Sequence, residues 1–372
     1  MKSKVKFILW GIVGWLVIFL GIEWWNSYPR ITLAPPMGST SLKEKLDSSL
    51  IASFNENFLA GISISIIRDS KVYHRKSLGF LDHDTHDSLN WNSTLPVASV
   101  SKLFTSLTLA RYLDRLDITL EDSLHILKLP ELDRETALGK LTFEELLRHQ
   151  SGISDPGKLN SLLSFQNNLS LETFGKELTQ KFASESQIKE YQYADSNFDL
   201  VGYLLQSYSG MDFTALSDSL TLERLGMGNS YFSFDHHLPN GHKKTRVWKR
   251  IKPAPMTLAL TPSPSSGLIS SVEDLEKSLI QMIRGDLGLL QSELNWLQSD
   301  PDLPPAGFQA ISLHDHTYFG HYGAQAGFSS LLVFDPTSKT GLILLANSKD
   351  DQDFRKKIAS QLLALMREED TL

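Results

Sequence analysis

The N-terminal apolar run constrains this chain more than any other feature of its sequence. No charged residue occurs from Phe7 to Ile22, and continuing past Glu23 to Trp25 gives 19 residues. A helix of that length covers about 28 Å at about 1.5 Å per residue, which is just enough to cross a hydrocarbon core. The run therefore predicts one transmembrane helix.

The residues that flank this run predict its orientation. Lysines occupy positions 2, 4 and 6, whereas only Arg30 follows the run before Lys43. Because positive charge favours the cytoplasmic side, we expect a single-pass membrane protein with a cytoplasmic N-terminus and the remaining chain outside, periplasmic or extracellular. A cleaved signal peptide is the alternative, but no small-x-small cleavage site follows the run. We interpret residues 1–30 as a membrane anchor with its flank.

Composition separates the rest of the chain from several classes of protein. Hydrophobic residues make up 41% of the 372 residues and charged residues 21%, which is typical of a folded globular protein. The formal charge of -7 disfavours a nucleic-acid partner unless the basic residues are gathered into one patch. The absence of cysteine excludes disulfides, thiolate nucleophiles and Fe–S clusters.

The two ends of the remaining chain predict strands, and its middle predicts helices. Residues 31–41, rich in Pro and Gly, are expected to form a tether. Hairpins are indicated at 60–78 and 329–346, where apolar runs flank turn-forming residues, and an amphipathic helix at 354–367.

We expect an α+β domain over 42–372, with an antiparallel sheet from about 42–90 and 265–372 flanked by helices. A mostly helical part from about 91–264 should border a cleft. Helix signals in these parts are Thr142–Glu145, Ser271–Asp274 and Asn197–Ser209.

A serine and a lysine with a spacing of three residues are the first candidates for catalysis. Ser99 and Lys102 precede a helical pattern that continues to Leu116. Within one first turn of a helix, an unprotonated amine could accept the hydroxyl proton during attack on an acyl group. The unpaired N–H groups of the helix start would also favour an anionic transition state. The pattern alone also fits an ordinary helix cap with a solvated lysine.

Several further segments make the chain resemble the serine β-lactamase and penicillin-binding-protein family. The resemblance is to the branch that includes class C β-lactamases, D-alanyl carboxypeptidases and related esterases, and it covers about residues 48–364. The matching segments occur in the family's order and spacing. They are Pro96–Thr105, Leu141–Ile153, Tyr193–Phe198, Leu225–Met227, Gly320–Gly323 and Gly327–Ser330.

The resemblance implies a role for each matching residue. Ser99 would be the acylated nucleophile, Lys102 its proton acceptor and relay, and Tyr193 the second base that activates water. The backbone N–H groups of Ser99 and Ala324 would form the oxyanion hole. The fold implied is the β-lactamase/transpeptidase-like fold.

Two positions depart from the family pattern and bear on the substrate. Asp195 stands where penicillin-recognising members usually keep Asn, and it should raise the pKa of Lys102 and shift the role of base to Tyr193. His321-Tyr322-Gly323 stands where the family has Lys-Thr-Gly, because the literal Lys339-Thr340-Gly341 falls in the turn of a hairpin. An ordinary imidazole is about a quarter protonated at pH 7, so fixed positive charge is lost. Asp195, His321 and Gly323 are the predicted substrate-binding residues.

These observations predict a serine hydrolase that needs no cofactor or metal. Groups of histidines, such as His314, His316 and His321, are interpreted as loop residues because no metal-binding motif accompanies them. The expected substrate is an ester, peptide or amide, either a small molecule or a peptide, and cell-wall fragments are among the candidates. The alternatives are a catalytically silent sensor or binding protein with the same fold, and a true β-lactamase or D-Ala-D-Ala carboxypeptidase.

Overall fold

The structure is a computed structural model of the chain. It describes residues 2–35, 38, 41–155, 169–182, 190–232, 238–256, 260–284, 291–298, 300 and 302–370.

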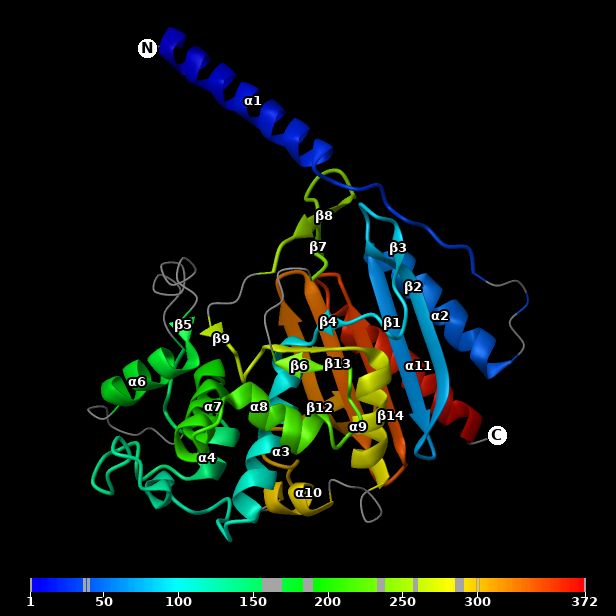
Figure 1. Ribbon diagram of the computed structural model, residues 1–372. Coiled ribbons are helices and arrows are strands. Elements are labelled where there is room, and N and C mark those ends of the chain that lie inside the picture. Colours follow the sequence, from blue (N-terminus) through cyan, green and yellow to red (C-terminus); the bar gives the residue numbers. More distant parts are fainter. Residues whose placement is uncertain are drawn as a thin grey trace.

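A seven-stranded antiparallel sheet forms the centre of the domain, in the order β11-β12-β13-β14-β1-β2-β3 (Figure 1). Strands from the two ends of the chain therefore meet where β1 pairs with β14. This confirms the predicted α+β fold, with its sheet drawn from the N- and C-terminal parts. The strands are β1 (Gly61–Arg68), β2 (Lys71–Asp82), β3 (Asp87–Ser88), β11 (Gln309–Leu313), β12 (His316–Gln325), β13 (Phe328–Asp335) and β14 (Thr340–Ala346).

Helices cover both faces of this sheet. On one face α2 (Leu42–Asn57) packs against α11 (Phe354–Asp370), and on the other α9 (Val272–Arg284) lies across β1, β13 and β14. Strand β14 alternates between the two hydrophobic cores, with Leu342 and Leu344 in one and Ile343 and Leu345 in the other. A strand buried on both faces reads as a continuous apolar run, which is the pattern of this segment.

The second part of the domain is built around α3 (Ser101–Asp114), most of which is buried. Helices α4 (Phe143–Leu147), α6 (Leu171–Phe182), α7 (Asp195–Ser209), α8 (Phe213–Ser217) and α10 (Gln291–Leu297) surround it. Short turns of other helix types are η1 (Ala98–Val100), η2 (Leu124–Leu127) and η3 (Asp218–Leu222). Small strands complete this part: β4 (Leu95–Pro96), β5 (Leu169–Ser170), β6 (Tyr231–Phe232), β9 (Leu260–Thr261) and β10 (Leu268–Ser270). The hairpin of β7 (Gly241–Lys244) and β8 (Ile251–Ala254) lies instead at the end of the central sheet nearest α1 (Figure 1).

The sequence predicted most of these elements, with two differences. Both hairpins and the C-terminal helix are present, Thr142 and Glu145 form a capping box, and Gly210 ends α7 with a left-handed backbone. The hairpin of β7 and β8, however, lies within residues expected to be mostly helical. The nucleophile candidate Ser99 also lies in the 3₁₀ turn η1 that precedes α3, and does not share a first α-helical turn with Lys102.

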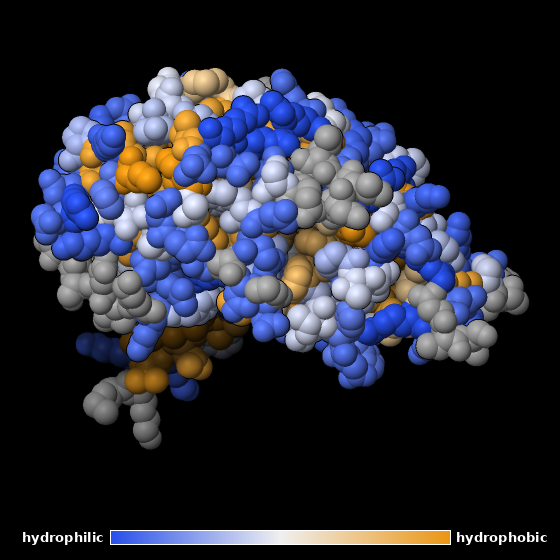
Figure 2. Space-filling model, turned by 90° about the horizontal axis from the view of Figure 1, so that it is seen from below, coloured by the Kyte–Doolittle hydropathy of each residue, from blue (hydrophilic) through white to orange (hydrophobic). Residues whose placement is uncertain are grey.

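The N-terminal helix α1 (Lys2–Trp25) projects away from the domain (Figure 1). Residues Lys4–Trp25 are long and apolar enough to cross a membrane, and the most apolar stretch is not buried against the rest of the chain. Most of the exposed large hydrophobic side chains belong to α1. The end of the domain opposite α1 is mostly hydrophilic (Figure 2).

Candidate active site

The turn η1 presents Ser99 between the sheet and the helical part. Ala98 has a left-handed backbone with φ of 48°, a conformation that non-glycine residues rarely adopt. Ser99 remains partly accessible while its neighbours Ala98 and Val100 are buried. Such local strain often occurs where a backbone must present one side chain to a cleft.

Lys102 is completely buried, with an exposed fraction of 0%, directly below this turn. Its Nζ donates to Asp195 Oδ1 at 2.6 Å and to the carbonyl oxygen of Ser265 at 3.1 Å. It also lies 5.1 Å from the centre of the Tyr193 ring. Burial lowers the pKa of Lys102, but Asp195 and Tyr193 outweigh burial, so the pKa is raised above its ordinary value. Lys102 is therefore an ammonium group at neutral pH, as the sequence predicted for a lysine beside Asp195.

The backbone of residues 263–268 holds the first turns of α3. Ser101 Oγ accepts a hydrogen bond from the N–H of Leu268, and Thr105 Oγ1 donates to the carbonyl of Pro264. The buried Asp199 accepts from the N–H of Ser265, whose carbonyl binds Lys102. Burial first, and the nearby Asp195 second, raise the pKa of Asp199 to about 7. The ammonium group is thus fixed by one carboxylate and one carbonyl.

The start of α7 positions Tyr193 and Asp195. Asp155 accepts hydrogen bonds from the N–H groups of Asp195 and Ser196, so a carboxylate caps the positive end of this helix. Tyr193 precedes the helix and is 38% exposed. Its ring lies against Lys102 on one side and 6.3 Å from the ring of His321 on the other. The structure therefore brings Lys102, Tyr193, Asp195 and His321 together.

His149 also belongs to this cluster, although no pattern in the sequence predicted a role for it. Its ring lies 4.4 Å from that of Tyr193, and its Nδ1 accepts from the N–H of Ala194 at 3.3 Å. Burial, followed by the charge of Lys102, lowers the pKa of His149 to about 4. The only signal was its place in the segment Leu141–Ile153, which matched the family without a stated function.

Strand β12 supplies the opposite wall of the site. Strand β11 pairs with β12 only as far as Gly320, so His321–Gln325 have no strand partner on that side. A Cβ at Gly323 would meet Val97 O at 2.2 Å and Ser330 Oγ at 2.1 Å. Only glycine therefore lets β12 pack this closely against the segment that leads into Ser99. Ala324 follows on the same strand and is exposed.

His321 is buried and neutral. Its Nδ1 donates to the carbonyl of Tyr322 at 2.6 Å, which leaves Nε2 as an acceptor. Burial first, and the charge of Lys102 second, lower the pKa of His321 to about 3. The group that stands in place of the family's lysine thus carries no charge at neutral pH. Lys339 lies in the turn between β13 and β14, outside this cluster.

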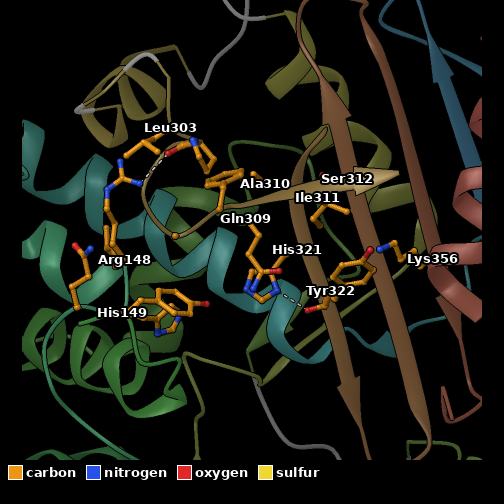
Figure 3. Close-up of a pocket in the computed structure, with 16 residues that line it drawn as sticks. Arg148, His149, Leu303, Gln309, Ala310, Ile311, Ser312, His321, Tyr322 and Lys356 are labelled. Carbon is orange, nitrogen blue, oxygen red and sulfur yellow. Dashed lines mark hydrogen bonds between the residues drawn. The ribbon is translucent and has the colours of Figure 1, made fainter. Parts of the chain in front are cut away.

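A cavity of about 610 Å³ opens beside these residues (Figure 3). His149 and His321 line it on the side of the cluster, and Tyr191, Phe308 and Ile311 contribute apolar surface. Arg148 and Lys356 lie at other parts of its wall, where Arg148 is bound to Glu144 and the carbonyl of Pro304. Within the described part of the chain, no group of three or more His, Asp or Glu side chains could hold a metal ion.

Comparisons with known proteins agree with this fold. The family model described as Beta-lactamase matches residues 48–366. Protein flp of Staphylococcus aureus strain MRSA252 is 24% identical over 82% of this chain and 63% of its own length, so the chain spans less than two thirds of that relative. The octameric penicillin-binding protein homologue from Pyrococcus abyssi has a TM-score of 0.70 at 23% identity, covering 87% of this chain and 76% of its own.

A class C β-lactamase from Rhodobacter sphaeroides has a TM-score of 0.71 at 14% identity over 86% of this chain and 99% of its own. The fold is that of the β-lactamase-fold proteins, which are generally serine hydrolases. The chain belongs to the β-lactamase family.

Proposed function

We propose that this chain is a serine hydrolase that forms an acyl-enzyme on Ser99. The observation that carries the proposal is the completely buried Lys102, held 2.6 Å from Asp195 and 5.1 Å from the Tyr193 ring, three residues after an accessible serine. Burying an ammonium group is costly unless it is paired, so a fold retains one mainly where it has a use. Stabilising charge next to a reacting hydroxyl is such a use.

Because Lys102 is already protonated, Tyr193 is the group proposed to move the proton. As Ser99 Oγ attacks the acyl carbon, its proton passes to the phenol oxygen of Tyr193, which gives its own proton to the leaving group. Lys102 stabilises the negative charge that develops on the phenol oxygen during this relay. Water then repeats the relay and releases the acyl group from Ser99. The backbone N–H groups of Ser99 and Ala324 are the proposed oxyanion hole.

The proposed substrate is a neutral ester or amide. His321 and His149 are both uncharged at neutral pH, and the charge of Lys102 is matched by Asp195. Among the described residues of this cluster, a substrate carboxylate, such as that of a penicillin or a D-Ala-D-Ala end, would meet no positive charge other than that of Lys102, which Asp195 matches. Arg148 and Lys356 lie at other parts of the cavity wall. A peptide substrate from the cell wall stays a second candidate, because α1 would place the domain near peptidoglycan.

Localisation is part of the same proposal. We propose that α1 anchors the protein in the cytoplasmic membrane with the N-terminus inside and the hydrolase domain outside. The length and exposure of Lys4–Trp25 support the anchor, and the lysines before it support the orientation. Added protease should digest the domain on intact spheroplasts, and protection of the domain there would overturn the orientation.

Labelling with a fluorophosphonate tests the proposed nucleophile against the silent-protein alternative. Wild type should be labelled, Ser99→Ala should not, and the surface control Ser93→Ala should be labelled like wild type. A labelled penicillin, used in parallel, should react more weakly than the fluorophosphonate. No Ser99-dependent label with either probe would favour a binding protein that keeps the fold without the reaction.

A further inference from the structure

The hairpin of β7 and β8 contacts the end of the N-terminal helix (Figure 1). Trp248 Nε1 donates to the carbonyl of Leu20 at 3.1 Å, and Lys252 Nζ lies 2.7 Å from Glu23 Oε1. Arg250 donates to Ser27 through both Nε and Nη2 and lies 5.2 Å from the Trp24 ring. Although the contacting residues are 223 to 229 positions apart in the sequence, the hairpin and the last turns of α1 form one contact.

This hairpin is rich in positive charge. Six of the ten residues from Lys243 to Lys252 are Lys or Arg, and no Asp or Glu occurs from Gly241 to Met256. Arg250 and Lys252 are bound to Ser27 and Glu23 of the N-terminal segment. The exposed cations at positions 243, 246 and 249 form no ion pair within the described part of the chain. We call Lys243–Lys249 the basic tip.

Apolar side chains lie between these cations at the end of the hairpin. Val247 is 57% exposed and Trp248 is 41% exposed, and both follow Arg246 and precede Lys249. Cations interspersed with tryptophan and aliphatic residues are typical of surfaces that bind the headgroup region of a bilayer. A surface made only for solvent would not need exposed apolar groups at this position.

The contact with Leu20 sets the height of the basic tip relative to a bilayer. Leu20 lies five residues before Trp25, so at about 1.5 Å per residue it lies about 7.5 Å further into the membrane. With Trp25 in the headgroup region, where tryptophan is enriched, Trp248 Nε1 is held near the boundary between the headgroups and the hydrocarbon. Other polyanions could meet the same charges in solution, but only a lipid surface is brought to this place by α1.

We propose that the basic tip binds the anionic phosphate headgroups of the bilayer that α1 spans, with Val247 and Trp248 inserted in its interface. This inference rests on the proposed membrane anchor. The hairpin would then fix the domain at the membrane surface at a second point besides α1.

A single fluorescent label tests the proposal, because the chain has no cysteine of its own. The full chain carrying Val247→Cys is labelled and placed in nanodiscs of phosphatidylcholine, with or without phosphatidylglycerol. Quenching by brominated acyl chains reports insertion, and quenching by aqueous iodide reports exposure. Asn295→Cys in α10, at the far end of the domain, is the matched label site and should stay exposed to iodide in both discs.

The proposal predicts at least about threefold stronger bromolipid quenching at position 247 with phosphatidylglycerol than without it. The triple variant Lys243→Gln, Arg246→Gln, Lys249→Gln should remove this difference, whereas Lys45→Gln, Lys71→Gln, Arg134→Gln, exposed cations elsewhere, should keep it. A label that is exposed to iodide in both discs, or equally inserted in both, would overturn the proposal.

A label at Trp15→Cys checks α1: if it is inserted while position 247 is not, the hairpin inference alone fails. If Trp15→Cys is itself outside the bilayer, the anchor and the hairpin inference both fail.

Discussion

At the scale of single residues, the site is governed by which of its titratable groups carry charge. Lys102 keeps its proton because Asp195 and Tyr193 counter the effect of burial, whereas His149 and His321 lose theirs because burial and the nearby ammonium act together. One buried cation, paired with the carboxylate of Asp195 and flanked by neutral imidazoles, suits a reaction in which negative charge develops only briefly. Two predictions follow from these charge states.

Replacing Asp195 with Asn should change the pH dependence of hydrolysis. The raised pKa of Lys102 depends on Asp195, so the Asn variant should lose the ammonium form at lower pH. We expect the alkaline limb of kcat/KM for a neutral ester to move to lower pH, so that activity falls at a pH on that limb. Asp114→Asn, at the far end of α3, is the control. An alkaline limb at the same pH in both variants would contradict the assigned charge of Lys102.

Acid should destabilise the protein through its buried histidines. The folded-state pKa of His321 is about 3, below the ordinary value of about 6.5, so the unfolded chain binds more protons between these values. Stability should therefore fall as the pH decreases through this window, by about 2–3 kcal/mol for this group between pH 7 and pH 4.5. The free energy of unfolding, measured in urea at pH 7 and at pH 4.5, should fall less in His321→Gln than in wild type, by about that amount. In His125→Gln it should fall as much as in wild type. Equal losses in His321→Gln and wild type would show that His321 is not buried neutral.

The candidate site could be predicted in part because its residues recur at fixed spacings. Ser99 and Lys102 are three residues apart, and Tyr193 and Asp195 belong to one short segment, so the resemblance of these segments to the family's motifs nominated them. Their roles in catalysis stay predictions. His149 was not nominated, because its place beside Tyr193 depends on how α7 packs and not on any local pattern. The burial that keeps His321 neutral also depends on how distant segments pack, so the sequence did not predict it.

At the scale of elements, the decisive contact is between η1 and β12. Ser330 Oγ on β13 donates to the carbonyl of Val97 at 2.6 Å, and Gly323 leaves room for that contact. Ser101 and Thr105 attach the following helix to residues 264–268. The nucleophile is thus presented by a turn that is tied to the sheet on one side and to a loop on the other.

Adding one methyl group at this contact should reduce activity. In Gly323→Ala the new Cβ would lie about 2 Å from Val97 O and Ser330 Oγ, so β12 or η1 must shift. We expect a loss of stability of about 1–3 kcal/mol and a decrease of kcat of about a hundredfold, measured by urea unfolding and ester hydrolysis. Gly228→Ala, where nothing lies within 4 Å of the added Cβ, should leave both unchanged. Wild-type activity in Gly323→Ala would show that the close packing is not required.

Elements that rely on local chemistry were predicted well, and those that rely on distant contacts were not. Both sheet hairpins have turn-forming residues between β-branched or apolar runs, so their turns and strands are encoded locally. Strands β7 and β8 contain three lysines between them and have no apolar alternation. They are held instead by the N-terminal segment, which pairs with Ile251 through Tyr28. A contact across more than 200 residues leaves no periodic signal in the sequence.

At the scale of the whole molecule, the chain between α1 and the domain is attached to the domain in its described part. Arg30 Nη2 donates to the carbonyl of Asn55 at 2.6 Å and lies 4.0 Å from the Phe58 ring. Asn55 makes two further hydrogen bonds with the backbone of Leu33, at 2.9 and 2.8 Å. The beginning of the predicted tether is thus packed on the domain, while residues 36, 37, 39 and 40 lie outside the described residues. The predicted domain boundaries stay a prediction.

These contacts should protect the peptide bond after Arg30 from trypsin. Asn55→Ala removes both hydrogen bonds to Leu33, each with a net contribution of about 1 kcal/mol, so local opening becomes more frequent. We expect cleavage of the full-length protein at this bond to be roughly tenfold faster or more, measured by mass spectrometry of timed digests. The exposed neighbour Glu56→Ala should digest like wild type. Unchanged cleavage in Asn55→Ala would mean that the segment is not held there.

The most direct test of the account is the mass of the full-length protein after brief exposure to a panel of neutral esters, D-amino peptides and β-lactams. We predict that at least one ester adds the mass of one acyl group, that the adduct maps to the peptide containing Ser99, and that Ser99→Ala carries none. Tyr193→Phe should react slowly and retain whatever acyl group it acquires. No covalent adduct with any compound, or an adduct that persists in Ser99→Ala, would contradict the proposed reaction.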